Sequence, residues 1–179
     1  MPDELTALRT HRDGLQAELG IPGVTCCLVD IDGLIWVNDQ FGHNTGDRVV
    51  ALVAAQIGRS LASARHALFR VGGDDFLAVL HGVDRTRARQ LAETILTDIR
   101  ELRIDYSRCD HPERRFLVVN AVLFTPSADD RQFGVVSYGL SESLRNRIAD
   151  AIYREKLRSH RHAEIIVELE DPSSAAGAG

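Results

Sequence analysis

Three acidic residues at the ends of apolar runs are the side chains in this sequence best suited to chemistry. Asp30 closes the run VTCCLVDI, and Asp74 and Asp75 follow the paired glycines Gly72 and Gly73 in FRVGGDDFLAV. Adjacent carboxylates repel each other, and Mg²⁺ relieves such repulsion because it binds a few carboxylates together with phosphate oxygens. If the first strand lies beside the hairpin, Asp30 approaches Asp74, and the sequence then offers a candidate metal site.

The stretch Gly-Gly-Asp-Asp is also typical of a solvated turn. Two glycines between apolar runs favour a primed hairpin turn, in which both central residues take positive φ. Glycines at 72 and 73 would equally let a ligand approach the backbone. These four residues alone leave both interpretations open.

Apolar periodicity and turn residues predict the elements that must position these acids. Asp84 is expected to cap the helix that follows it. The order of elements indicates an α/β (α+β) fold, a single domain with a central mixed β-sheet flanked by helices. A polar bend is expected at 38–47, charged or polar loops at 105–114 and 126–138, and a disordered tail at 169–179. Helices are expected at 3–19, 48–64, 84–101 and 140–159, strands at 24–31, 115–125 and 163–170, and hairpin arms at 66–71 and 76–80.

Composition and charge favour a cytoplasmic globular domain. The chain has 179 residues, 44% hydrophobic and 26% charged, with a formal net charge of -5 and no evident basic face, so we expect no nucleic-acid partner. It lacks an apolar stretch of about 18 residues and a signal-peptide core, so we expect no membrane association. Three cysteines, two of them adjacent, form no disulfide framework, and Cys26 and Cys27 should point to opposite faces of a strand.

The order of the polar motifs resembles that of the GGDEF domain family, the diguanylate cyclases. The matching stretches are DELTALRTHR at 3–12, DIDGLIWVNDQFGHNTGD at 30–47, RVGGDDF at 70–76 and AIYREK at 151–156. The resemblance spans about residues 3–168. It implies a palm-like nucleotidyl cyclase fold for a domain at 1–168, with a GGDDF signature.

The resemblance implies a role for each matching residue. Mg²⁺ or Mn²⁺ would be held by Asp30, the Ile31 carbonyl and Asp74, and the catalytic acids would be Asp74 and Asp75. GTP would be bound by Gly33, Leu34, Ile35, Asn38, His43, Asp47, Gly72, Gly73 and Lys156. A carboxylate at 47 suits guanine, because it accepts hydrogen bonds from N1–H and N2–H₂, which adenine cannot donate.

Plainer interpretations exist for several of these residues. Asn38 and His43 would serve equally to shape a polar bend, Asp47 to place negative charge at a helix start, and Lys156 to solvate a helix face. Trp36 and Tyr153 are interpreted as packing residues rather than as chemical groups.

The activity implied is condensation of two GTP molecules into cyclic di-GMP and pyrophosphate across a two-fold homodimer. Departures from the family pattern motivate an alternative, a degenerate domain that binds GTP as a regulatory module without turnover. Another possibility is a related enzyme that makes a different product. With no sensor domain recognisable, we expect a minimal or excised module, or a separate sensor protein. The departures are Asp75 for Glu, Ile35 for Lys, Ser159 and His160 for Gly and Arg, Ser63 and His66 for the inhibitory Arg-x-x-Asp, and a strand at 115–125 without Ser-x-Gly.

Overall fold

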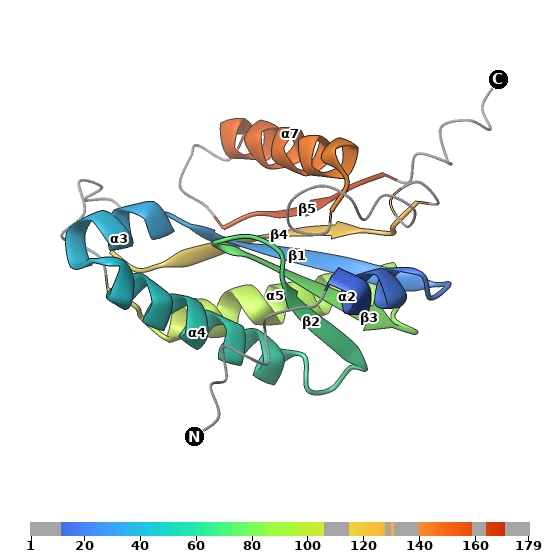
Figure 1. The fold of residues 1–179 in the computed structure, drawn as a ribbon, viewed down its shortest axis with the longest axis horizontal. Coiled ribbons are helices and arrows are strands. Elements are labelled where there is room, and N and C mark those ends of the chain that lie inside the picture. The colour runs from blue at the N-terminus through green and yellow to red at the C-terminus, as the bar shows by residue number, and fades with distance from the viewer. Residues whose placement is uncertain (1–11, 106–114, 128–129, 131–139, 159–163, 171–179) are drawn as a thin grey trace.

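In the described part of the chain, five strands form one mixed sheet at the centre of the domain (Figure 1). The computed structural model describes residues 12–105, 115–127, 130, 140–158 and 164–170. The strand order is β2-β3-β1-β4-β5, with antiparallel pairing except between β4 and β5, which are parallel. The predicted single domain with a mixed sheet is therefore confirmed. The strands are β1 (Val24–Asp32), β2 (His66–Arg70), β3 (Asp75–His81), β4 (Val118–Phe124) and β5 (Ile166–Glu168).

Helices cover both faces of the sheet, and each face has its own apolar core. Figure 1 shows α7 on one side of the sheet and α4 and α5 on the other. Cys27 belongs to the core beneath α4 and α5, whereas Cys26 belongs to the core beneath α2 and α7. The expected opposite orientation of these two cysteines is confirmed, while Cys109 lies outside the described residues. The helices are α2 (Arg12–Leu19), α3 (Leu34–Phe41), α4 (His43–Ser60), α5 (Arg85–Glu101) and α7 (Glu142–Arg158).

The predicted polar bend at 38–47 is wrong, because nearly all of that stretch is helical. Leu34–Phe41 forms α3, and α4 begins at His43 rather than at 48 and ends at Ser60 rather than at 64. Gly42 separates the two helices. Apolar residues are sparse here because α3 and the first turns of α4 each bury only one narrow side. In α3 the buried residues are Leu34 and Val37. The polar residues between them are therefore typical of a loop as well as of a half-exposed helix.

The other elements agree with the predictions apart from their ends. Of the predicted helix at 3–19, the structure describes Arg12–Leu19, and the strands predicted at 115–125 and 163–170 shorten to β4 and β5. Most of the predicted loops at 105–114 and 126–138, and residues 171–179 of the predicted tail, fall outside the described residues. Along the described part of the chain, no helix combines the length and the apolar character needed to cross a membrane.

Asp84 caps α5 as predicted. Its Oδ1 accepts a hydrogen bond from the Arg87 amide at 2.7 Å, which satisfies one of the amides left open at the start of the helix. The remaining turns of α5 bury Leu91, Ile95 and Ile99 against the sheet. The cap therefore fixes where the helix that supports β1 and β4 begins.

Replacing Asp84 with Ala should lower the free energy of unfolding by about 1 kcal/mol, because the amide of Arg87 loses its acceptor. Asp84→Ser, which keeps a capping oxygen, should recover most of that loss. Urea denaturation followed by circular dichroism measures both variants. If the Ser variant is no more stable than the Ala variant, the capping bond does not contribute.

Candidate metal centre and adjoining cleft

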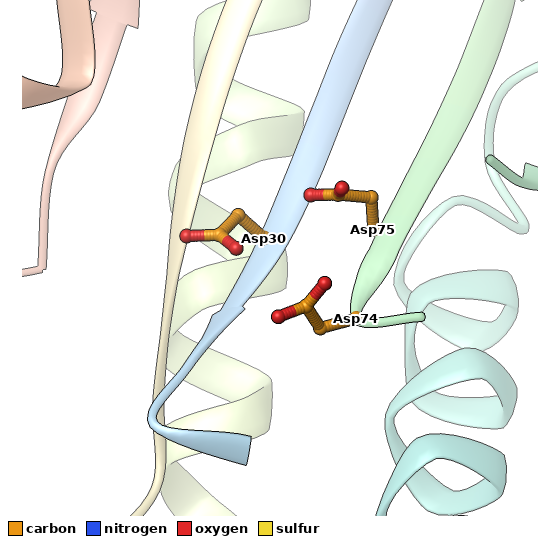
Figure 2. Close-up of side chains that lie close together, drawn as sticks. All are labelled: Asp30, Asp74 and Asp75. Carbon is orange, nitrogen blue, oxygen red and sulfur yellow. The ribbon is translucent and has the colours of Figure 1, made fainter. Parts of the chain in front are cut away.

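Pairing between β1 and β3 brings the three predicted acids together. Asp30 and Asp75 are directly opposed in the antiparallel register, and the Ile31 amide donates to the carbonyl of Asp74 at 3.1 Å. One carboxylate oxygen from each of Asp30, Asp74 and Asp75 lies within 4.8 Å of the others. Figure 2 shows the side chains of Asp74 and Asp75 directed from the start of β3 toward Asp30. The expected approach of Asp30 to Asp74 is confirmed.

The turn that carries Asp74 differs from the predicted two-glycine turn. The Val71 amide donates to the Asp75 carbonyl at 2.9 Å, so Gly72, Gly73 and Asp74 form the connection between β2 and β3. Neither glycine has positive φ, so that part of the prediction is wrong. Gly72 is needed for space instead: a Cβ there would lie 2.5 Å from Oδ2 of Asp75.

Arg70 holds this turn from the end of β2. Its Nε donates to the Gly72 carbonyl at 3.2 Å, and its Nη2 donates to the Gly73 carbonyl at 2.6 Å. Charge-assisted bonds of this kind are stronger than neutral ones. They tie the backbone on which Asp74 and Asp75 are mounted to an adjacent strand.

Burial and mutual repulsion make the charged form of this cluster unfavourable. Burial, followed by the charges of Asp30 and Asp74, raises the pKa of Asp75 to about 7. Burial also raises the pKa of Asp30, although a hydrogen bond from Asn120 and the charge of Lys156 oppose the shift. Three close carboxylates with hard oxygen donors fit a divalent cation such as Mg²⁺ or Mn²⁺, which would favour their ionised form.

Two further polar contacts surround the acids. Asn120 on β4 donates from Nδ2 to Oδ2 of Asp30 at 3.3 Å. Lys156 on α7 places Nζ 3.3 Å from Oδ2 of Asp32 at the end of β1. The predicted phosphate-contacting lysine is thus an ion-paired cation beside the acid cluster.

A cleft of about 310 Å³ opens beside the cluster, between α3, α4 and the β2–β3 turn. Asn38, His43 and Asp47, which are predicted to bind GTP, line it together. Gly46 provides the room for Asn38, because a Cβ at 46 would lie 1.8 Å from Oδ1 of Asn38. Other lining residues are Leu34, Ile35, Val50, Arg70, Gly73 and Asp74.

A second cavity of about 640 Å³ lies on the α7 side of the same acids. Lys156 and all three carboxylates line it, and Gly73 and Asp74 belong to the walls of both hollows. Tyr153 also lines it and is 64% exposed, so the prediction that this residue packs in the core is wrong. Its neighbour Ile152 packs against the core instead, and successive helix residues point about 100° apart. Trp36 packs against the core as predicted.

Two of the predicted residues, Gly33 and Ile31, line neither hollow with a side chain, so they are placed to contribute backbone groups only. Gly33 precedes α3 with φ of 86°, and its carbonyl accepts from the Trp36 and Val37 amides. The amides of Leu34 and Ile35 in the first turn have no acceptor within the helix, as at any helix start. The side chain of Ile31 is buried in the core, on the sheet face opposite Asp30.

Sequence reasoning missed three residues of this region. Asn120 is a single polar residue in the apolar run VVNAVLF, and Gly46 lies within the quoted GHNTGD motif. Arg145 lines the larger cavity, and its buried Nε has no hydrogen-bond partner among the described residues. The sequence feature that could have revealed Arg145 is its position next to Leu144, which lies on the buried side of α7.

This architecture is the fold of solved GGDEF and GGEEF domains. The family profile described as "Diguanylate cyclase, GGDEF domain" matches residues 16–132, and the chain therefore belongs to the GGDEF family.

Individual relatives agree with this assignment. A probable diguanylate cyclase, DgcT of Escherichia coli, is 32% identical over 126 residues, which are 68% of this chain and 28% of that protein. The active GGEEF domain of a diguanylate cyclase from Vibrio cholerae superposes with a TM-score of 0.63 at 22% identity, covering 92% of this chain and 99% of that one. The GGDEF domain of DgcB from Caulobacter crescentus, in complex with c-di-GMP, gives 0.59 at 23% identity, covering 87% and 84%.

The raised pKa of Asp75 predicts a pH-dependent stability. Between about pH 4 and 7, folded Asp75 holds a proton that the unfolded chain, with a pKa near 3.8, has released. The free energy of unfolding should therefore fall as pH rises through this window and level off above it. In Asp75→Asn, this contribution should be absent. Urea titrations of both proteins from pH 4.5 to 8, with a chelator present, measure the difference, and parallel pH profiles would contradict the shift.

Proposed function

We propose that this domain is a diguanylate cyclase, which condenses two GTP molecules into cyclic di-GMP and pyrophosphate. The observation that supports the proposal most strongly is the shared wall at Asp74. The acid cluster there borders a cleft that also contains Asn38 and Asp47. If the acids bind a cation and the cleft binds guanine, the two would lie next to each other, as a phosphoryl-transfer reaction on GTP requires.

Guanine recognition would come from α3 and α4. The carboxylate of Asp47 would accept from N1–H and N2–H₂ of the base, and Nδ2 of Asn38 would donate to O6. Adenine has no donor at N1 or C2 and would leave the carboxylate of Asp47 unpaired. His43, which lines the same cleft, would contact the nucleoside from the start of α4.

The phosphates would lie between the start of α3 and α7. The open amides of Leu34 and Ile35 at the helix start favour phosphate oxygens, and Lys156 supplies a positive charge from the opposite side. A divalent cation bound by Asp30, Asp74, the Ile31 carbonyl and Asp75 would neutralise charge on the phosphates and acidify the attacking 3′-hydroxyl. Asp75 is the member of the acid cluster that we propose as the acceptor of the hydroxyl proton.

The product requires two nucleotides, and each domain offers one guanine cleft of this kind among its described residues. Each 3′-hydroxyl must attack the α-phosphate of the other GTP, so two copies would face each other with two-fold symmetry. We therefore propose a homodimer as the active species, and a separate sensor protein as the partner that would control its assembly.

A regulatory GTP-binding module without turnover is the second candidate. Ile35 is 66% exposed at the cleft, in the place where the family pattern has a lysine, so one cation for the triphosphate is missing. Asp75 is one methylene shorter than the glutamate of the pattern, and small displacements near reacting atoms reduce rates strongly. Calorimetry that finds GTP binding, combined with no product on chromatography, would favour this candidate.

Asp74→Ala should abolish cyclic di-GMP formation from GTP and Mg²⁺, because the variant loses the carboxylate shared by the metal centre and the cleft. The fold should remain, since removing one of three repelling carboxylates does not weaken the core. Asp150→Ala is the matched control, because that carboxylate on α7 is 74% exposed and lies outside both cavities. Chromatography of the products tests the prediction, and full activity in Asp74→Ala would remove the metal assignment. Mixed ATP and GTP in the same assay would reveal a different product.

Gly46→Ala should weaken GTP binding at least about tenfold, because the new methyl group collides with Asn38 and displaces the guanine-reading amide. Gly58→Ala on the same helix is the control, since an added Cβ there meets no atom within 4 Å. Isothermal calorimetry with a non-reactive GTP analogue compares the two. Equal affinities would argue that Asn38 does not read the base.

A further inference from the structure

A row of polar side chains crosses the sheet face beneath α7. The strand register places Asp75 of β3 opposite Asp30 of β1, and Asp30 opposite Asn120 of β4. Asn120 is 1% exposed, and its neighbours Val119 and Ala121 are fully buried. A buried amide on an apolar strand is unfavourable unless its polar atoms find partners, so its presence at the edge of the acid cluster calls for a reason.

Within the part of the chain that the structure describes, one end of the Asn120 amide is satisfied and the other is not. Nδ2 donates to Oδ2 of Asp30 at 3.3 Å. The reverse orientation would place the amide oxygen against an oxygen of the ionised Asp30 carboxylate, which is repulsive, so the NH₂ group of the amide faces Asp30 when that carboxylate is ionised. Oδ1 is then buried, and among the described residues no donor reaches it. An acceptor without a donor, adjoining a cluster of cation ligands, points to a donor that arrives with the cation.

We propose that Asn120 is a positioning residue of the metal centre, which orients Asp30 through Nδ2 and accepts a hydrogen bond at Oδ1 from a water molecule bound to the cation. The inference rests on the proposed function, in that it requires a divalent cation at Asp30, Asp74 and Asp75. Mg²⁺ and Mn²⁺ retain several waters when they bind few carboxylates, and those waters need acceptors. Mutation of a residue that holds a metal ligand in this way typically lowers the metal affinity by about 10- to 100-fold.

A purely structural role for Asn120 is the competing hypothesis. Asn120 would then serve only to pair with Asp30 across β1 and β4 and to help set the strand register. The two hypotheses differ in one measurable quantity. A structural role predicts lower stability with unchanged metal affinity in the folded protein, whereas a positioning role predicts weaker metal binding.

Titration with Mn²⁺ alone, without nucleotide, separates them. Electron paramagnetic resonance of free Mn²⁺ gives the affinity of the whole chain, and thermal unfolding gives the stability. Asn120→Leu is similar in size and removes both donor and acceptor, so its Mn²⁺ affinity should fall about tenfold or more. Asn120→Ser keeps a hydroxyl, should fold more readily and should lose less affinity. Val122→Ala, two residues along the same buried face of β4, should lose stability and keep the wild-type Mn²⁺ affinity.

The outcomes are distinguishable. Mn²⁺ affinities of both Asn120 variants within twofold of wild type would overturn the positioning role. The same holds if Val122→Ala weakens Mn²⁺ binding as much as Asn120→Leu does. Asp74→Asn provides the reference for the centre itself. If wild type and Asp74→Asn bind Mn²⁺ equally weakly, the metal centre fails, and the role of Asn120 fails with it.

Discussion

Repulsion between carboxylates is the constraint around which this domain is arranged. One carboxylate oxygen from each of Asp30, Asp74 and Asp75 lies within 4.8 Å of the others, and the pairing of β1 with β3 places Asp30 directly opposite Asp75. Three neighbouring residues support the close placement of these carboxylates. Arg70 fixes the turn, Gly72 leaves room for the Asp75 carboxylate, and Asn120 donates to Asp30. The stability of the fold is therefore partly opposed by the repulsion within this cluster.

Residue types along the chain are sufficient to predict most of the scaffold. Runs such as VTCCLVDI and FLAVL are long and apolar enough to define buried strands, and Asp84 marks a helix start by its capping chemistry. The stretch 34–47 is harder to predict because α3 and the first turns of α4 expose polar faces. Their helicity depends on Leu34 and Val37 packing against a core that is formed by residues distant in sequence. The local sequence pattern alone therefore does not predict packing against that core.

The candidate site is predictable only in part. Motif order identifies the acids and the cleft residues, and β1–β3 pairing brings both into one region. The conformation of the Gly72-Gly73 turn is not predictable, because neither glycine has positive φ and Gly72 instead leaves space for the side chain of Asp75. Asn120 and Arg145 escape prediction for a similar reason. Their significance comes from neighbours on other strands and helices, and a single polar residue in an apolar segment occurs in many structural settings.

The position of Asp74 between the two hollows has a consequence for the design of ligands. Asp74 borders a cleft of about 310 Å³ on the α3–α4 side and a cavity of about 640 Å³ on the α7 side. Compounds of unlike shape, bound in different hollows, would compete for the same carboxylate and would otherwise meet only at Gly73. Two fragments, one bound in each hollow and linked past Gly73, would occupy both hollows at once.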